Sequence, residues 1–177
     1  MSFRIFIHGL ESSNQGTKSV FFRERYPDMV IPYFTGPLNE RMKSLNSVLV
    51  QKTGIILVGS SFGGLMAAIF AMENEERVGR MILLAPAINL VEFADYRSKT
   101  LSVPVWIYHG RLDEVIPLND VEKLAKSVFH HLSFHEVEDD HYLQKTFRTL
   151  DWDRLLSPHP VIQTVERFPE AGDRSAV

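Results

Sequence analysis

One stretch, residues 55–68, constrains the fold of this chain more than any other. It begins with the apolar run Ile55-Ile56-Leu57-Val58, passes through Gly59-Ser60-Ser61-Phe62-Gly63 and ends in small and apolar residues. A short apolar run rich in β-branched residues is typical of a strand that is buried on both faces of a parallel sheet. The stretch therefore predicts a buried strand that turns at once into a helix packed on the same sheet.

The turn between that strand and that helix carries the pattern Gly-x-Ser-x-Gly, with Ser61 at its centre. A strand that reverses into a helix within one residue strains the backbone of the central serine, and the flanking glycines remove Cβ atoms that would collide there. The hydroxyl of Ser61 would stand at the positive end of the helix, and the backbone N–H of Phe62 would face negative charge that develops on a substrate oxygen. We therefore expect Ser61 to be a nucleophile; the alternative is an ordinary glycine-rich turn.

Composition narrows the class of protein. A chain of 177 residues suits a single domain, which we expect over residues 1–169, followed by a frayed tail at 170–177. The net charge of −3 offers no basic face for nucleic acid, and the absence of cysteine excludes disulfides, thiolate metal sites and a cysteine nucleophile. No apolar run approaches the roughly 18 residues of a membrane span, and we expect a cytoplasmic protein.

Strand-like and helix-like segments alternate along the chain. The expected strands are residues 3–7, 29–34, 55–58, 80–84, 103–108 and 132–137, and the expected helices are residues 17–25, 39–51, 62–74, 118–130 and a last one from Ser157 that carries Val161, Ile162, Val165 and Phe168. Pro32 suggests that the second strand is short or lies at an edge. The alternation predicts an α/β fold, a three-layer α/β/α sandwich with a mostly parallel sheet of about six strands.

Ligands of such sheets bind beyond the carboxyl ends of the strands. The polar groups that follow the expected strands are His8-Gly9-Leu10, Ser61, Asp113 and Asp139-Asp140-His141. A serine hydroxyl needs a base within hydrogen-bond reach and an acid that orients the base. His141 is the candidate base and Asp113 the candidate acid.

These segments resemble the α/β-hydrolase superfamily, and the chain is most similar to the small bacterial serine esterases that lack a cap domain. The resemblance is carried by Phe6-Ile7-His8-Gly9-Leu10 with Ser12-Ser13, by Val58-Gly59-Ser60-Ser61-Phe62-Gly63-Gly64, by His109-Gly110-Arg111-Leu112-Asp113-Glu114-Val115-Ile116-Pro117 and by Asp140-His141. It implies a catalytic triad of Ser61, Asp113 and His141, in the chain order of that superfamily. It also implies an oxyanion hole made by the backbone N–H groups of Leu10 and Phe62.

The chain departs from the larger members of that superfamily in three places. It lacks their first two strands, and residues 84–103 leave room only for a short helix where larger relatives insert a lid. The segment from Tyr142 to Leu156 is longer than the resemblance implies. Trp152 in that segment could cover the site or pack on the sheet, and we expect it to pack.

Other side chains compete for the proposed roles. Asp139 and Asp140 are rival acids for His141, but adjacent residues rarely point at the same ring. His135 is a rival base, although its place in a strand pattern suggests a surface residue. The remaining histidines lack the spacing of a zinc site, so we expect no metal and no cofactor. We expect His8 to brace the loop of Leu10 and His109 to belong to the end of a strand.

The resemblance implies a serine hydrolase that cleaves a carboxylic ester or thioester through an acyl-enzyme. The substrate would be a small acyl compound, and we expect no nucleic-acid partner and no membrane span. A thioesterase, peptidase or acyltransferase on the same triad is an alternative, and so is a non-catalytic binding protein of the same fold. The sequence does not predict the oligomeric state.

Overall fold

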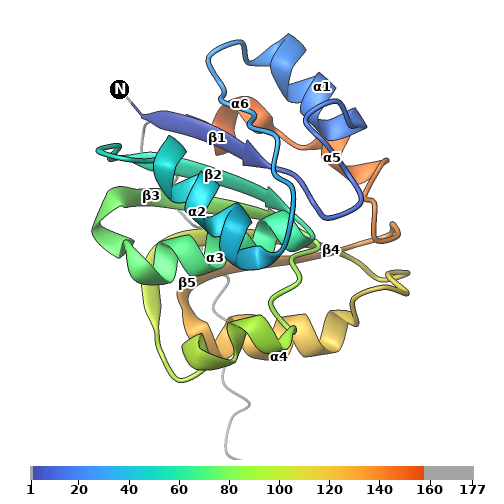
Figure 1. The fold of residues 1–177 in the computed structure, drawn as a ribbon. Helices are drawn as coiled ribbons and strands as arrows, with labels where there is room; N and C mark the ends of the chain where they lie inside the picture. Colours follow the sequence, from blue (N-terminus) through green and yellow to red (C-terminus); the bar gives the residue numbers. More distant parts are fainter. Residues whose placement is uncertain (1, 158–177) are drawn as a thin grey trace, which may run out of the picture.

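Parallel strands form the sheet at the centre of the computed structural model, which describes residues 2–157 (Figure 1). The sheet has five strands in the order β1-β2-β3-β4-β5, so each strand pairs with the one that follows it in the chain. These strands are β1 (Phe3–Ile7), β2 (Ile55–Ser60), β3 (Val78–Leu84), β4 (Leu101–Gly110) and β5 (Phe129–Val137). Their carboxyl ends share one edge of the sheet because all of them run in the same direction.

Helices cover both faces of this sheet, which confirms the expected three-layer α/β/α fold (Figure 1). One face is covered by α2 (Leu38–Val48), α3 (Phe62–Glu73) and α4 (Leu118–Val128). The other face is covered by α1 (Thr17–Arg25), α5 (Thr146–Thr149) and α6 (Trp152–Leu155). Two short 3₁₀ helices, η1 (Glu75–Arg77) and η2 (Val91–Tyr96), complete the described elements.

The alternation of side chains along β2 explains why its sequence is apolar throughout. Ile55 and Leu57 belong to the core cluster on the side of α3, whereas Ile56 and Val58 belong to the cluster on the side of α1. Both sets are almost completely buried, so neither face of the strand tolerates a polar residue. Ser61 directly follows this strand and is therefore anchored to a part of the sheet that is buried on both faces.

The strand expected over residues 29–34 is reduced to a single bridge. Val30 pairs with Ile5 in parallel, with hydrogen bonds of 3.0 Å from the Phe6 N–H to the Val30 carbonyl and from the Val30 N–H to the Arg4 carbonyl. Pro32 then follows, and it has no N–H with which to continue the ladder. The sheet consequently has five strands rather than about six.

Trp152, in the segment from Tyr142 to Leu156, packs against the helices on one face of the sheet, as expected. Trp152 is buried, its ring centroid lies 4.7 Å from that of Phe22, and its indole N–H donates to the Phe147 carbonyl. The helix expected from Ser157 onward and the tail at 170–177 lie outside the described residues, so the extent of the domain stays a prediction. Within the described part of the chain, no helix has both the length and the apolar character needed to cross a membrane.

Candidate active site

Ser61 occupies a strained turn between β2 and α3. Its backbone angles are φ 54° and ψ −118°, a conformation that costs a non-glycine residue on the order of 1–3 kcal/mol. The backbone N–H of Ser61 donates to the Leu84 carbonyl at 2.9 Å, and the Ser61 carbonyl accepts the N–H groups of Gly64 and Ala87 at 2.9 and 3.0 Å. These bonds to β3, α3 and the loop after β3 hold the serine in a conformation that it would not adopt alone.

The glycines on either side of Ser61 are required by close backbone contacts. A Cβ atom on Gly63 would lie 2.0 Å from the Ile7 carbonyl oxygen, and one on Gly59 would lie 2.5 Å from the Gly63 carbonyl oxygen. Real Cβ atoms essentially never approach other atoms so closely. The Gly-x-Ser-x-Gly pattern therefore lets the turn pack tightly against β1.

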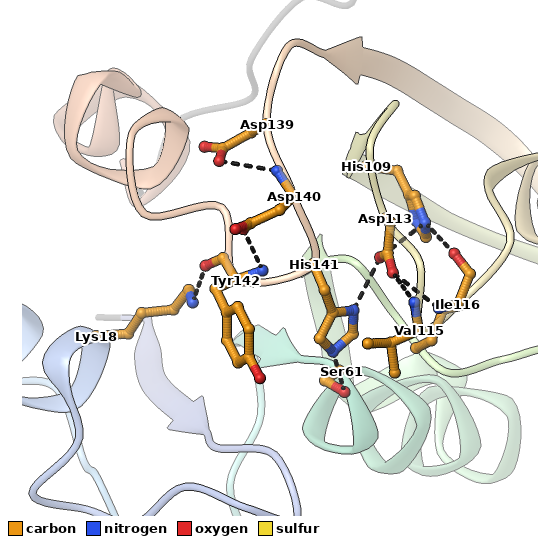
Figure 2. A network of polar contacts seen from close by, with 10 residues as sticks. All are labelled: Lys18, Ser61, His109, Asp113, Val115, Ile116, Asp139, Asp140, His141 and Tyr142. Atoms are coloured by element: carbon orange, nitrogen blue, oxygen red, sulfur yellow. Dashed lines mark hydrogen bonds and ion pairs between the residues drawn. The ribbon is translucent and has the colours of Figure 1, made fainter.

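The structure brings together the three side chains predicted to form a triad (Figure 2). The Nε2 atom of His141 lies 3.0 Å from the Ser61 hydroxyl oxygen, and its Nδ1 atom lies 2.8 Å from Oδ2 of Asp113. The Asp113 side chain is fully buried, and that of His141 is 11% exposed. Beside an ionised carboxylate, Nδ1 carries the proton, which leaves the lone pair of Nε2 facing the Ser61 hydroxyl.

Asp113 is held by its own loop and by a second histidine. Its Oδ1 atom accepts backbone N–H groups of Val115 at 2.9 Å and Ile116 at 2.8 Å. Its Oδ2 atom, which faces His141, also lies 3.2 Å from Nε2 of His109. The sequence predicts His109 only as the end of a strand, and its contact with Asp113, four residues further along the chain, is a finding of the structure.

Asp139 shapes the loop that carries His141. Its Oδ1 atom accepts the Asp140 N–H at 2.9 Å, and its Oδ2 atom accepts the N–H groups of Lys145 at 3.0 Å and Thr146 at 2.8 Å, at the start of α5. Burial opposes ionisation of this carboxyl, but the hydrogen bonds outweigh burial and lower the pKa of Asp139. Asp139 is therefore a charged support of the loop.

The rival acids and the rival base make other contacts. Asp139 bonds to the backbone as described, and Oδ1 of Asp140 accepts the Tyr142 N–H at 2.8 Å. His135 stacks on Tyr108 with 4.7 Å between ring centroids, and burial lowers its pKa. Of the carboxylates considered for His141, Asp113 is the one in hydrogen-bond contact with its ring.

Lys18 of α1 contacts the same loop. Its ammonium group donates to the Tyr142 carbonyl at 2.5 Å and lies 5.3 Å from the centroid of the Phe147 ring. Burial lowers the pKa of Lys18 to about 8, against the attraction of Asp139 and Asp140. The loop of His141 is thus tied to the helix on one face of the sheet.

The loop after β1 is braced by His8. The Phe34 N–H donates to Nε2 of His8 at 3.0 Å, so Nδ1 must carry the proton, which it donates to the Gly9 carbonyl at 2.8 Å. Burial lowers the pKa of His8, which favours this neutral form. In a planar trans peptide the N–H of Leu10 points opposite to the Gly9 carbonyl, hence away from His8.

The two expected oxyanion donors, the backbone N–H groups of Leu10 and Phe62, belong to the loop after β1 and to the first residue of α3. A Cβ atom built on Gly9 would lie 3.3 Å from the Ser61 Cβ atom, so the backbone that precedes Leu10 touches the serine. Phe62 is the first residue of α3, where helical N–H groups have no partner in the helix. The loop and turn hydrogen bonds of the described residues include none from the backbone N–H of Leu10 or Phe62.

Within residues 2–157, no group of three or more His, Cys, Asp or Glu side chains is arranged to hold a metal ion. Ser61, His141 and Asp113 form one continuous chain of contacts from a hydroxyl to a buried carboxylate.

Comparisons with known proteins agree with this fold. The mouse α/β-hydrolase domain-containing protein 10 superposes with a TM-score of 0.70 at 18% identity, covering 82% of this chain and 84% of the mouse chain. Est1E of Butyrivibrio proteoclasticus, bound to ferulic acid, gives 0.69 at 16% identity and covers 84% of both chains. A monoacylglycerol lipase of Paleococcus ferrophilus gives 0.69 at 13% identity, with 89% of this chain and 95% of the lipase covered. At these identities the likeness shows the fold alone.

The family of this chain is shown by comparison of its sequence with family models. No curated protein matches it at a significant level. The model of the dienelactone hydrolase family, however, matches residues 27–139, which is more than half of the chain and includes the turn of Ser61 and the loop of Asp113. The chain therefore belongs to the dienelactone hydrolase family of the α/β-hydrolase superfamily.

Proposed function

We propose that this hydrolase cleaves carboxylic esters or thioesters through an acyl-enzyme formed on Ser61. The observation that supports this most is the chain of contacts from the Ser61 hydroxyl through His141 to the buried Asp113 carboxylate, at 3.0 and 2.8 Å. An unassisted serine is a weak nucleophile, and this arrangement supplies both the base and the group that orients it. A binding protein would have no use for a strained serine with a matched base and acid.

The proposed reaction has two halves. Ser61 Oγ attacks the carbonyl carbon while His141 Nε2 takes the hydroxyl proton, and Asp113 stabilises the resulting imidazolium. The N–H groups of Leu10 and Phe62 hold the negative oxygen, a contribution of about 3 kcal/mol for one such donor. The tetrahedral intermediate then expels the alcohol or thiol, which receives the proton from His141. Water attacks the acyl-enzyme by the same route, which releases the acid and regenerates the Ser61 hydroxyl.

Exposed apolar side chains near Ser61 support an acyl substrate. Leu10 is 52% exposed on the loop after β1, Val115 is 64% exposed on the loop of Asp113, and Tyr142 is 56% exposed beside His141. Val115 is held beside the triad by its backbone N–H, which donates to Oδ1 of Asp113 at 2.9 Å (Figure 2). Apolar carbons next to the scissile carbonyl would find contacts on these side chains. Among the structural neighbours, the monoacylglycerol lipase is named for cleaving an ester.

The nucleophile can be tested by covalent labelling with a fluorophosphonate. We expect the wild-type protein and the neighbouring control Ser60→Ala to be labelled and Ser61→Ala to lose labelling. Ser61→Ala should also reduce p-nitrophenyl ester hydrolysis by roughly 10³-fold or more. The kcat/KM of the wild type should rise from acid to neutral pH, because only the neutral imidazole of His141 accepts the proton.

Other results of these experiments would contradict the proposed mechanism or change the proposed substrate class. Labelling that persists in Ser61→Ala would identify another nucleophile, and a flat profile between about pH 5 and 8 would contradict the role of His141. A screen of p-nitrophenyl esters and acyl-CoA thioesters of several chain lengths, with peptides added, separates an esterase from a thioesterase or peptidase. Neither labelling nor turnover in any arm would favour a non-catalytic binding protein.

A further inference from the structure

A second buried histidine contacts the carboxylate of the candidate site. His109 is the last residue but one of β4 and is completely buried. Its Nε2 atom lies 2.9 Å from the Ile116 carbonyl oxygen and 3.2 Å from Oδ2 of Asp113. Figure 2 shows Asp113 between the rings of His109 and His141, and both rings approach the same carboxylate oxygen.

The surroundings of His109 determine where its proton lies. Both neighbours of Nε2 are oxygen acceptors, so Nε2 carries the hydrogen and shares it between the Ile116 carbonyl and Asp113. The other nitrogen, Nδ1, is buried and has no hydrogen-bond partner among the described residues. A proton on Nδ1 would therefore be unsatisfied, and burial lowers the pKa of His109 accordingly, against the attraction of Asp113. His109 is a neutral donor.

We propose that His109 is a positioning residue that acts through Asp113, holding the carboxylate so that Oδ2 faces the Nδ1–H of His141. This inference rests on the proposed function, because it presupposes that Asp113 orients the base. The backbone N–H groups of Val115 and Ile116 fix Oδ1. The Nε2–H of His109 fixes Oδ2 from the side away from His141, which leaves the carboxylate no freedom to rotate.

The bond to Ile116 raises the alternative that His109 only braces the loop. A brace would act on stability alone, and its loss would reduce activity in parallel with folding. A positioning residue acts on the ring of His141 as well. When Asp113 turns away, the imidazolium of His141 loses its counter-charge, so the acid limb of the kcat/KM profile moves to lower pH and kcat falls more than KM changes.

Three substitutions separate these roles by where they place a donor. His109→Gln can put an amide N–H at the position of Nε2, His109→Asn carries its amide only as far as Nδ1, and His109→Phe keeps a ring without a donor. We expect His109→Gln to stay within about threefold of wild-type kcat/KM, and the other two to lose about 10- to 100-fold. We also expect their acid limbs to move to lower pH.

A spectroscopic readout keeps the test independent of turnover. The Nδ1 proton between His141 and Asp113 should give a far-downfield proton resonance, which can be recorded in Ser61→Ala and in the double variant with His109→Phe. We expect the resonance in Ser61→Ala and its loss or rapid exchange in the double variant. Should the wild type hydrolyse nothing, the proposed function fails while this comparison still decides the role of His109.

The proposal is overturned by either of two results. One is a folded His109→Phe variant with wild-type kcat and acid limb, together with a double variant that keeps the downfield resonance of Ser61→Ala. The other is a parallel loss of thermal midpoint and activity in all three variants with an unchanged pH profile, which is the result expected of a brace. If His109→Phe does not fold, the pair of Gln and Asn variants decides the question by the same two readouts.

Discussion

The pair His-Gly occurs at the carboxyl ends of two strands, β1 and β4, and the histidine binds different partners at each end. His8 and His109 are both buried, and both are held neutral. His8 uses both ring nitrogens on backbone groups, the Gly9 carbonyl and the Phe34 N–H. His109 uses one nitrogen, and that nitrogen reaches both a backbone carbonyl and the side chain of Asp113.

Gly9 and Gly110, which follow these two histidines, also contact different parts of the site. A Cβ atom on Gly9 would lie 3.3 Å from a side-chain atom of Ser61, whereas one on Gly110 would lie 2.3 Å from the Asp139 carbonyl oxygen and 2.6 Å from that of Asp140. The first loop touches the nucleophile, and the second packs backbone to backbone against the loop of His141. The same dipeptide therefore orients a peptide group at the end of β1 and a carboxylate at the end of β4.

The largest expected difference is in the free energy of unfolding, between alanine substitutions at Gly110 and at Gly9. Gly110→Ala should lower the free energy of unfolding by about 3 kcal/mol, because backbone atoms of the neighbouring loop must move. Gly9→Ala should cost less than about 1 kcal/mol of stability yet reduce kcat, since its methyl group presses on Ser61. Urea unfolding and ester hydrolysis measure the two effects. Equal losses of stability in Gly110→Ala and Gly9→Ala would contradict the tighter packing of Gly110.

A smaller effect on kcat is expected from substitutions that distinguish the donor nitrogen of each histidine, which is Nδ1 in His8 and Nε2 in His109. At position 8, asparagine places an amide donor near the position of Nδ1 and can keep the bond to the Gly9 carbonyl, whereas glutamine reaches only toward Nε2 and Phe34. We therefore expect His8→Asn to retain most of kcat and His8→Gln to lose about 10- to 100-fold, approaching the loss of one oxyanion donor.

This ranking is the reverse of that expected at position 109, where glutamine is the better replacement. Steady-state kinetics of the four variants, with KM determined separately, tests the reversal. The same ranking at both positions would mean that the two histidines serve one common structural purpose. Thermal midpoints of the variants provide the control for folding.

Local sequence patterns predicted the parts of the site that depend on neighbours in the chain. The glycines around Ser61 reveal a strained turn because the strain and its relief lie within five residues of sequence. The order of the strands places Asp113 and His141 at the same sheet edge as Ser61, and the structure brings them into contact. The contact between His109 and Asp113 could not be predicted from a local pattern, because it depends on how the loop after β4 folds back.

Two further features needed the tertiary structure. Val30 lies in an apolar run with the composition of a strand, but Pro32 removes the donor that would extend its pairing beyond one bridge. The short helices α5 and α6 have too few residues to show a helical period. Asp139 organises the first of them through the N–H groups of Lys145 and Thr146, and that role is invisible in a sequence where Asp139 reads as a neighbour of His141.

The smallest expected effect is a loss of stability in acid, and it tests whether the loop of His141, on which Gly110 packs, depends on a charged carboxylate. Gly110 packs on Asp139, whose carboxylate accepts three backbone N–H groups, while the His8 loop is braced by a neutral ring. Asp139→Asn must lose part of these bonds, because an amide offers one oxygen and turns a donor toward the others. We expect it to lower the free energy of unfolding by about 1–2 kcal/mol near neutral pH.

The sign of the pH dependence follows from the lowered pKa of Asp139. Its stabilisation is fully present above the ordinary pKa of an aspartate in the unfolded chain, 3.8, and is lost as the pH falls through the lower value in the folded protein. The difference in stability between wild type and Asp139→Asn should therefore stay constant above about pH 5 and shrink below about pH 4. Asp140→Asn is the matched control, since its amide oxygen can still accept the Tyr142 N–H and its loss should stay below about 0.5 kcal/mol. A difference that grew in acid would show that the charge of Asp139 opposes folding, and the loop of His141 would then owe its position to packing against Gly110 alone.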